Sequence, residues 1–126
     1  MFWNIILAVL FFGLIGYLFI LPKSTASKND FNPDLSFELV KNGALLIDAR
    51  SPEEFGAEHI EGAINIPHNK IEDKLSEIES LLEGDKNKAI VIYCQSGRRS
   101  EIVKKALQKQ AYKTVINHGG IDSWKK

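Results

Sequence analysis

The polar and apolar positions along the chain fall into stretches of strand length that alternate with stretches of helix length. Short apolar runs bounded by turn residues predict buried strands at residues 44–48, 63–66, 90–93 and 114–117. Apolar residues at helical spacing predict helices over residues 35–40, 71–82 and 102–107. This alternation predicts an α/β fold: a small parallel sheet, centred on the 90–93 run, with helices on both faces.

The segment Ser51-Pro52-Glu53-Glu54 has the composition of a helix start. Ser51 is placed to cap the helix, Pro52 suits the first turn, and Glu54 completes a capping box. We therefore interpret Glu53 and Glu54 as helix-start residues and not as catalytic acids.

The N-terminal stretch has a different pattern. Residues 2–21 contain one strongly polar side chain, Asn4, and no charge. A helix of about 20 residues spans ~30 Å, the thickness of a bilayer core, so we expect residues 1–21 to form one transmembrane helix. A cleaved signal peptide is the alternative, because Ser24-Thr25-Ala26 resembles a cleavage site. Residues 22–33 are expected to be a linker, and residues 34–126 one domain.

Charge bears on location and partners. Lys23 and Lys28 follow the apolar segment. The positive-inside rule then favours a single-pass membrane protein with a cytoplasmic domain, and a periplasmic or secreted domain is the alternative. The formal net charge is +0, which gives no indication of a nucleic-acid partner. The sequence does not indicate an oligomeric state.

The single cysteine, Cys94, follows the central apolar run and opens a short loop. Backbone N–H groups in such a loop, a helix N-terminus and nearby arginines all favour the thiolate form of cysteine. The loop continues with Gln95, Ser96, Gly97, Arg98, Arg99 and Ser100. For catalysis, the thiolate must be exposed inside the ring of main-chain donors. The alternative is that Cys94 is a small buried apolar residue without chemistry.

Several segments together resemble the rhodanese family of sulfurtransferases. They are the loop Cys94-Gln95-Ser96-Gly97-Arg98-Arg99-Ser100, the segment 45–55 with its Asp48-Ala49-Arg50 motif, the segment 59–67, and the segment 119–124. Their order and spacing match the family from about residue 34 to residue 126, in the variety of the small single-domain bacterial rhodaneses.

The resemblance implies a sulfurtransferase without a cofactor. No pair among the three histidines has metal-ligand spacing with Cys94, so we expect no metal site. Cys94 would take sulfane sulfur from a small anionic donor such as thiosulfate, carry it as a persulfide, and pass it to cyanide or a thiol. The resemblance assigns substrate binding to Gln95, Ser96, Gly97, Arg98, Arg99 and Ser100. It assigns the organisation of the turns beside the loop to Asp48, Arg50 and His59.

Finer roles follow from the same resemblance. We expect Arg99 to brace the loop and Arg98 to meet substrate at its rim. Ser100 is expected to cap the following helix. We interpret His59 and His118 as structural residues rather than as a general base for the cysteine. Four residues separate the cysteine from Arg99, one fewer than in phosphatases of the same fold, so we expect no useful phosphatase activity.

Two other functions stay open. One is a persulfide carrier tethered to the membrane, which is loaded once and hands its sulfur to a partner. The other is a tethered structural domain, for which replacing Cys94 with serine changes nothing. Because the sequence stops two residues after Trp124, we also expect a frayed final helix and a loose turn at Gly119-Gly120.

Overall fold

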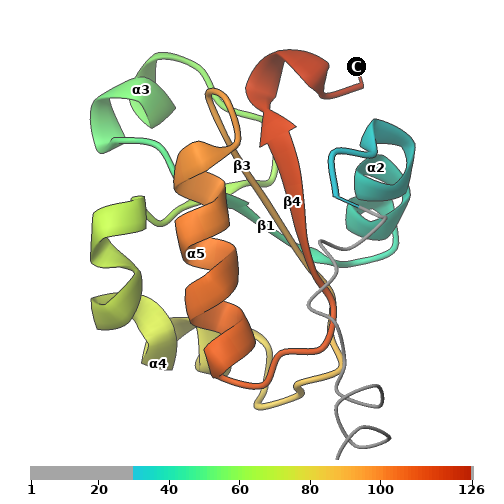
Figure 1. Ribbon diagram of the computed structural model, residues 1–126, viewed down its shortest axis with the longest axis vertical. Coiled ribbons are helices and arrows are strands. Elements are labelled where there is room, and N and C mark those ends of the chain that lie inside the picture. Colours follow the sequence, from blue (N-terminus) through green and yellow to red (C-terminus); the bar gives the residue numbers. More distant parts are fainter. Residues whose placement is uncertain (1–29, 126) are drawn as a thin grey trace, which may run out of the picture.

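The computed structural model of this protein describes residues 30–125. Its centre is a four-stranded parallel sheet with strand order β2-β1-β3-β4 (Figure 1). The strands are β1 (Leu45–Asp48), β2 (Ile64–Asn65), β3 (Ile90–Cys94) and β4 (Val115–Gly120). The helices are α2 (Pro33–Lys41), α3 (Pro52–Ala57), α4 (Ile71–Leu81) and α5 (Arg98–Lys109), and the 3₁₀ turns are η1 (His68–Lys70) and η2 (Ile121–Ser123). The predicted α/β fold with a parallel sheet is confirmed.

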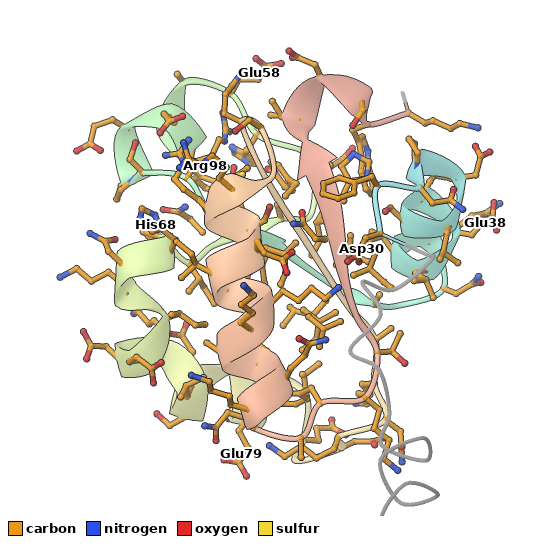
Figure 2. The ribbon with its side chains drawn as sticks, in the orientation of Figure 1. Asp30, Glu38, Glu58, His68, Glu79 and Arg98 are labelled. Atoms are coloured by element: carbon orange, nitrogen blue, oxygen red, sulfur yellow. The ribbon has the colours of Figure 1, made fainter. Side chains whose placement is uncertain are left out.

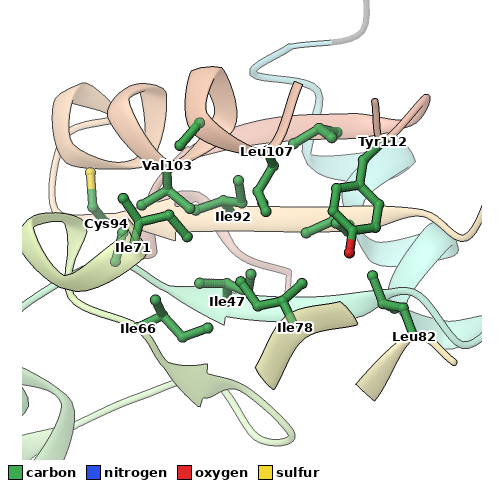
Figure 3. Packing of buried hydrophobic residues seen from close by; sticks show 14 residues of the cluster. Ile47, Ile66, Ile71, Ile78, Leu82, Ile92, Cys94, Val103, Leu107 and Tyr112 are labelled. Atoms are coloured by element: carbon green, nitrogen blue, oxygen red, sulfur yellow. The ribbon is translucent and has the colours of Figure 1, made fainter. Parts of the chain in front are cut away.

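Helices cover both faces of the sheet. The helices α4 and α5 lie on one face, and α2 lies on the other (Figure 1). On the first face, Ile92 of β3 packs in one cluster with Val103 and Leu107 of α5 (Figure 3). On the second face, Val91 and Tyr93 pack toward α2. Because both faces are covered, each strand is apolar on both sides, and the strands could be recognised as continuous apolar runs.

The helix starts follow local sequence chemistry. Asn32 caps α2, since its side-chain oxygen accepts a hydrogen bond from Leu35 N at 3.2 Å. The capping box predicted at the start of α3 is present: Glu54 N donates to Ser51 Oγ at 3.2 Å, and Ser51 N donates to Glu54 Oε1 at 3.4 Å.

The C-terminal part of the domain differs from the expectation. Gly119 and Gly120 belong to β4, where Gly120 pairs with Cys94 of β3. The expectation of a loose turn at these glycines and a frayed final helix after them is therefore wrong. The short 3₁₀ turn η2 follows the strand instead. Trp124 packs edge-on against His118, with ring centroids 5.1 Å apart, so this end of the chain is anchored to the sheet.

The strand β4 contains a β-bulge. Ile92 pairs with Asn117, but the next residue, Tyr93, pairs with Gly119, so His118 is an extra residue opposite β3. Asn117 bonds to Ser100 of α5, on one side of the sheet. His118 packs against Trp124, which in turn packs against the cluster on the α2 side. Beyond the bulge, Gly119 pairs with Tyr93 and Gly120 pairs with Cys94, so the end of β4 lies beside the loop that follows β3.

The folded unit extends upstream of residue 34. Asp30 forms an ion pair with Lys104 of α5, and these side chains are only 8 % and 4 % exposed. Phe31 N donates to Asn117 O at 2.9 Å, which ties the incoming chain to β4. The expected transmembrane helix or signal peptide at 1–21, and most of the expected linker, lie outside the described residues. Within residues 30–125, no helix is long and apolar enough to cross a bilayer.

Candidate active site

Cys94 is the last residue of β3, where the chain leaves the sheet for α5. Ligands of open parallel sheets bind outside the carboxyl ends of the strands, which is where this residue lies. Cys94 is 1 % exposed, so the expectation of an exposed thiol is wrong for this structure. The next two residues, Gln95 and Ser96, are exposed. The sulfur therefore sits at the base of a loop whose following side chains reach solvent.

A main-chain amide and a hydroxyl converge on the Cys94 sulfur. Gly97 N donates to Sγ at 2.9 Å, and Ser100 Oγ lies 3.4 Å from Sγ. Burial alone would raise the pKa of the Cys94 thiol, but hydrogen bonds from Ser100, Ser96 and Gly97 outweigh that effect and lower the pKa below its ordinary value. The surroundings therefore favour a thiolate, the reactive form of cysteine.

The loop depends on two glycines. Gly97 has a φ of 94°, and a Cβ there would lie 3.0 Å from the Phe31 ring and 3.3 Å from Gly119 Cα. A Cβ at Gly120 would lie 2.6 Å from the Gln95 carbonyl oxygen. The end of β4 can therefore lie directly against the loop only because these positions carry no side chain. Gly97 is also the N-cap of α5, so the positive end of the helix dipole follows the cysteine closely.

Arg99 joins the start of α5 to α3. Its Nη1 donates to Glu54 Oε1 at 2.6 Å, and its Nη2 donates to Glu54 Oε2 at 3.0 Å. The hydrogen bond from Arg99 is the main reason that the pKa of Glu54 is lowered to about 2. This geometry suits a bracing role for Arg99. It also gives Glu54, interpreted above as a helix-start residue, a second contact that sequence reasoning missed.

Other residues assigned to substrate binding lie at the surface. Gln95, Ser96 and Arg98 are exposed, and Arg98 projects from the first turn of α5 (Figure 2). Within residues 30–125, no carboxylate lies at ion-pair distance from the Arg98 guanidinium. The structure thus divides the loop into groups that contact the sulfur and side chains that face solvent.

Asp48 and Arg50 form a compact buried turn. The Asp48 carboxylate accepts hydrogen bonds from Arg50 N at 2.8 Å, Nε at 3.1 Å and Nη2 at 2.8 Å. These hydrogen bonds raise the pKa of Arg50. Arg50 also donates to the Glu58 carbonyl and lies 5.8 Å from the centre of the Tyr93 ring. Both side chains are engaged within the turn, which suits the organising role that the resemblance assigns to them.

Within residues 30–125, neither His59 nor His118 forms a hydrogen bond with the Cys94 sulfur, which the Gly97 amide and the Ser100 hydroxyl contact. His59 is exposed and stacks on Phe55, with ring centroids 3.9 Å apart. His118 is buried against Trp124, and burial lowers its pKa. This placement agrees with a structural role for both.

The expectation that Ser100 caps α5 is wrong. Gly97 occupies the cap position, and no side chain forms a capping hydrogen bond there. Instead, Ser100 Oγ donates to Asn117 Oδ1 at 2.7 Å. Asn117 in turn donates from Nδ2 to the Gly97 carbonyl at 2.9 Å. Sequence reasoning missed Asn117, since an asparagine at the end of a predicted strand carries no signal of its partners in a distant loop.

Known proteins resemble this chain across the domain. The family model for the rhodanese-like domain matches residues 33–126. The thiosulfate sulfurtransferase PspE of Escherichia coli is 37% identical over 75 residues, which cover 60% of this chain and 68% of PspE. The putative sulfur carrier protein YrkF of Bacillus subtilis is 34% identical over 91 residues, which cover 68% of this chain but 46% of YrkF. Among solved structures, a rhodanese with anions from E. coli matches with a TM-score of 0.57 and 36% identity, covering 64% of this chain and 91% of that chain.

Proposed function

Because the chain belongs to the rhodanese-like domain family, we propose that it moves sulfane sulfur from a small anionic donor, such as thiosulfate, to a thiophilic acceptor through a persulfide on Cys94. The observation that carries the proposal is the pair of groups on the sulfur, the Gly97 amide at 2.9 Å and the Ser100 hydroxyl at 3.4 Å. The relative named as a thiosulfate sulfurtransferase supports the choice of donor.

In the first step, the Cys94 thiolate attacks the outer sulfur of thiosulfate. A new S–S bond forms, the S–S bond of the donor breaks, and its electron pair leaves on sulfite. The thiolate's negative charge passes to the terminal sulfur of the persulfide, so charge is conserved. Main-chain N–H groups of the loop and the N-terminus of α5 stabilise this charge.

In the second step, the acceptor attacks the terminal sulfur. Cyanide becomes thiocyanate, or a thiolate becomes a persulfide, and Cys94 leaves as the thiolate. This covalent route splits one transfer into two displacements. An S–S bond is about 2.05 Å long. The persulfide therefore carries the reactive sulfur away from a Cys94 thiol that is itself only 1 % exposed.

Arg98 and Arg99 have separate tasks in this proposal. Arg99 is held by Glu54 and braces the loop. Arg98 is exposed at the first turn of α5, where a guanidinium that no carboxylate of residues 30–125 pairs with attracts an anionic donor. Gln95 and Ser96, which are exposed beside it, complete the rim that meets the substrate.

A carrier that is loaded once is the second candidate. The burial of the Cys94 thiol favours it, since a sulfur that is 1 % exposed suits slow exchange with small molecules. The relative named as a putative sulfur carrier also favours it, although the similarity covers 46% of that protein. Steady-state turnover of thiosulfate and cyanide supports the enzyme, whereas a single slow loading supports the carrier.

The proposal is tested by the intact mass of the full chain before and after thiosulfate treatment. Cys94 is the only cysteine, so a gain of one sulfur atom can be assigned to it. The persulfide also has no second thiol with which to form an internal disulfide, so the adduct is expected to persist until an acceptor is added. The Cys94→Ala variant is the matched control and should gain nothing. An unchanged mass for the wild type would contradict the proposal.

In the topology that we propose, the transmembrane helix predicted at residues 1–21 tethers the protein to the membrane, and the domain lies in the cytoplasm. The uncharged apolar composition of residues 2–21, followed by Lys23 and Lys28, supports this topology. The full chain should stay with membranes after alkaline carbonate extraction, and protease added outside intact cells should leave the domain uncut. Release of a shortened chain would support the signal peptide instead.

A further inference from the structure

The side chain of Asn117 is fully buried and uses all of its hydrogen-bonding capacity. The residue is 0 % exposed. Its Oδ1 accepts from Ser100 Oγ at 2.7 Å and from Gly119 N at 3.0 Å. Its Nδ2 donates to Gly97 O at 2.9 Å and to Glu101 Oε2 at 2.9 Å. An amide side chain offers two donor hydrogens and an oxygen with two lone pairs, so no position is left unused.

Two of these partners also contact the sulfur. Gly97 is held at both of its main-chain ends, because its N–H points to Cys94 Sγ at 2.9 Å and its carbonyl accepts from Asn117 at 2.9 Å. The Ser100 hydroxyl lies 2.7 Å from Asn117 Oδ1 and 3.4 Å from Cys94 Sγ. A serine hydroxyl has one hydrogen, which it gives either to Asn117 Oδ1 or to the sulfur. The link by which Asn117 supports a donor to the thiolate therefore runs through Gly97.

We propose that Asn117 is a positioning residue for the Cys94 thiolate: it holds Gly97 so that the Gly97 N–H points to the sulfur. Asn117 does not touch the sulfur itself, and it acts through Gly97. This inference rests on the proposed function, because sulfur transfer is the reaction that would use the thiolate.

The orientation matters because Gly97 has a left-handed backbone with a φ of 94°. A glycine reaches this region and others with little steric cost, so its conformation is set by its partners. Without the bond from Asn117, the Gly97 carbonyl is buried without that partner and the adjacent N–H can turn away from the sulfur. A thiolate that loses a donor is less stable, and the pKa of the thiol rises.

The test measures the rate at which iodoacetamide alkylates Cys94 in the full chain, as a function of pH. Asn117→Leu removes the donor to Gly97 O, together with the other three hydrogen bonds of the Asn117 side chain, and keeps a similar branched shape. We expect its alkylation midpoint to rise by roughly one pH unit, which makes alkylation about tenfold slower well below the midpoint. In NMR spectra, the Gly97 amide proton should shift and exchange faster. A folded Asn117→Leu variant with the wild-type midpoint and the wild-type Gly97 signal would overturn the proposal.

Two further variants keep the test decisive. Asn117→Asp has the same shape and keeps an acceptor for Ser100, but it loses the amide donor to Gly97 O. It serves where Asn117→Leu does not fold, and an unchanged midpoint in it would also overturn the proposal. Leu82→Ala is the control for stability loss alone, because Leu82 lies at the opposite end of the apolar cluster from Cys94 (Figure 3). It should lower the unfolding free energy without moving the midpoint.

Alkylation does not require sulfur transfer, so the two proposals can fail separately. If the wild type takes up no sulfur from thiosulfate but the Asn117 variants shift the alkylation midpoint, sulfur transfer is overturned and the positioning role stands. If the wild type takes up sulfur and the Asn117 variants keep the wild-type midpoint, the positioning role is overturned and sulfur transfer stands.

Discussion

Arg99 and Glu54 form a two-point ion pair, with N–O distances of 2.6 Å and 3.0 Å, between the first turns of α5 and α3. The Glu54 carboxylate also bonds to Ser51 at the helix start. One side chain therefore links the start of α3 to the loop that carries Cys94. The position of the loop depends on a helix that lies outside it.

This ion pair should make the stability of the domain sensitive to acid. The pKa of Glu54 is lowered from 4.5 to about 2, mainly by the hydrogen bond from Arg99. Such a carboxylate adds stability above its unfolded pKa and loses it as the pH falls through its folded pKa. Because the Glu54 side chain is 36% exposed, solvent screening limits the effect to about 1 kcal/mol.

The Glu54→Gln variant should therefore lose less unfolding free energy than the wild type between pH 4.5 and pH 2, as measured by urea denaturation at each pH. Glu53→Gln is the matched control, since Glu53 is exposed and lies next to Glu54 in the same helical turn. Equal acid slopes for all three proteins would contradict the prediction.

The second prediction concerns the acidity of Cys94. Hydrogen bonds lower the pKa of its thiol despite burial, so the alkylation midpoint of the folded chain should lie below the ordinary value of about 8.5. In denaturant, the midpoint should return to that value. The folded state then gains stability from the thiolate above the unfolded pKa and loses it as the pH falls through the folded pKa. A folded midpoint at or above the denatured one would refute this.

The third prediction compares two buried serines, Ser100 and Ser36. Ser100→Ala removes the hydroxyl that lies 3.4 Å from the sulfur, so the pKa of Cys94 should rise and alkylation near neutral pH should slow. Ser36→Ala is the control, because Ser36 is 0 % exposed and its Oγ has no hydrogen-bond partner within residues 30–125. It should be neutral or stabilising by about 1 kcal/mol and leave alkylation unchanged. Equal alkylation rates in the two variants would refute the assignment.

The fourth prediction concerns the ion pair between Asp30 and Lys104. Both side chains are more than nine-tenths buried. Asp30→Ala leaves the Lys104 ammonium buried without its partner, which should cost about 3 kcal/mol of unfolding free energy. The double variant Asp30→Ala/Lys104→Met should recover most of that loss, because no buried charge remains. Urea denaturation of the full chains measures both, and a double variant no more stable than Asp30→Ala would contradict the idea.

The fifth prediction concerns phosphate esters. Four residues separate Cys94 from Arg99, so the ring of amides should be too tight for a phosphoryl group and suited to one sulfur atom. We expect no turnover of an aryl phosphate above the background of a Cys94→Ala control. Hydrolysis by the wild type that disappears in this control would show that the loop accepts phosphate.

The features that could be predicted from the sequence are those determined by near neighbours in the chain. The capping box needs only Ser51 and Glu54, three positions apart. The strand that ends at Cys94 is a continuous apolar run, and the glycine after it lies where the chain must take a left-handed turn. Such features can be recognised in the sequence without knowledge of the rest of the fold.

The missed features depend on segments that meet only after folding. Lys104 lies on a helix where a lysine usually faces water, yet Asp30 from the incoming chain covers it. Asn117 of β4 reaches Ser100 of α5, a residue 17 positions away in the chain. The burial of Cys94 likewise results from elements that pack around the loop, and its own sequence neighbours do not indicate it.

The family match begins at residue 33, but Asp30 and Phe31, which precede it, already form hydrogen bonds to Asn117 of β4. Alignments compare side chains, and the bond from Phe31 N to Asn117 O involves only main-chain atoms. A protein trimmed to the aligned region would keep every motif but lose these hydrogen bonds to β4, the strand that lies beside the Cys94 loop. Low stability or activity of such a trimmed protein would then result from the lost hydrogen bonds and would say nothing about its sulfur chemistry.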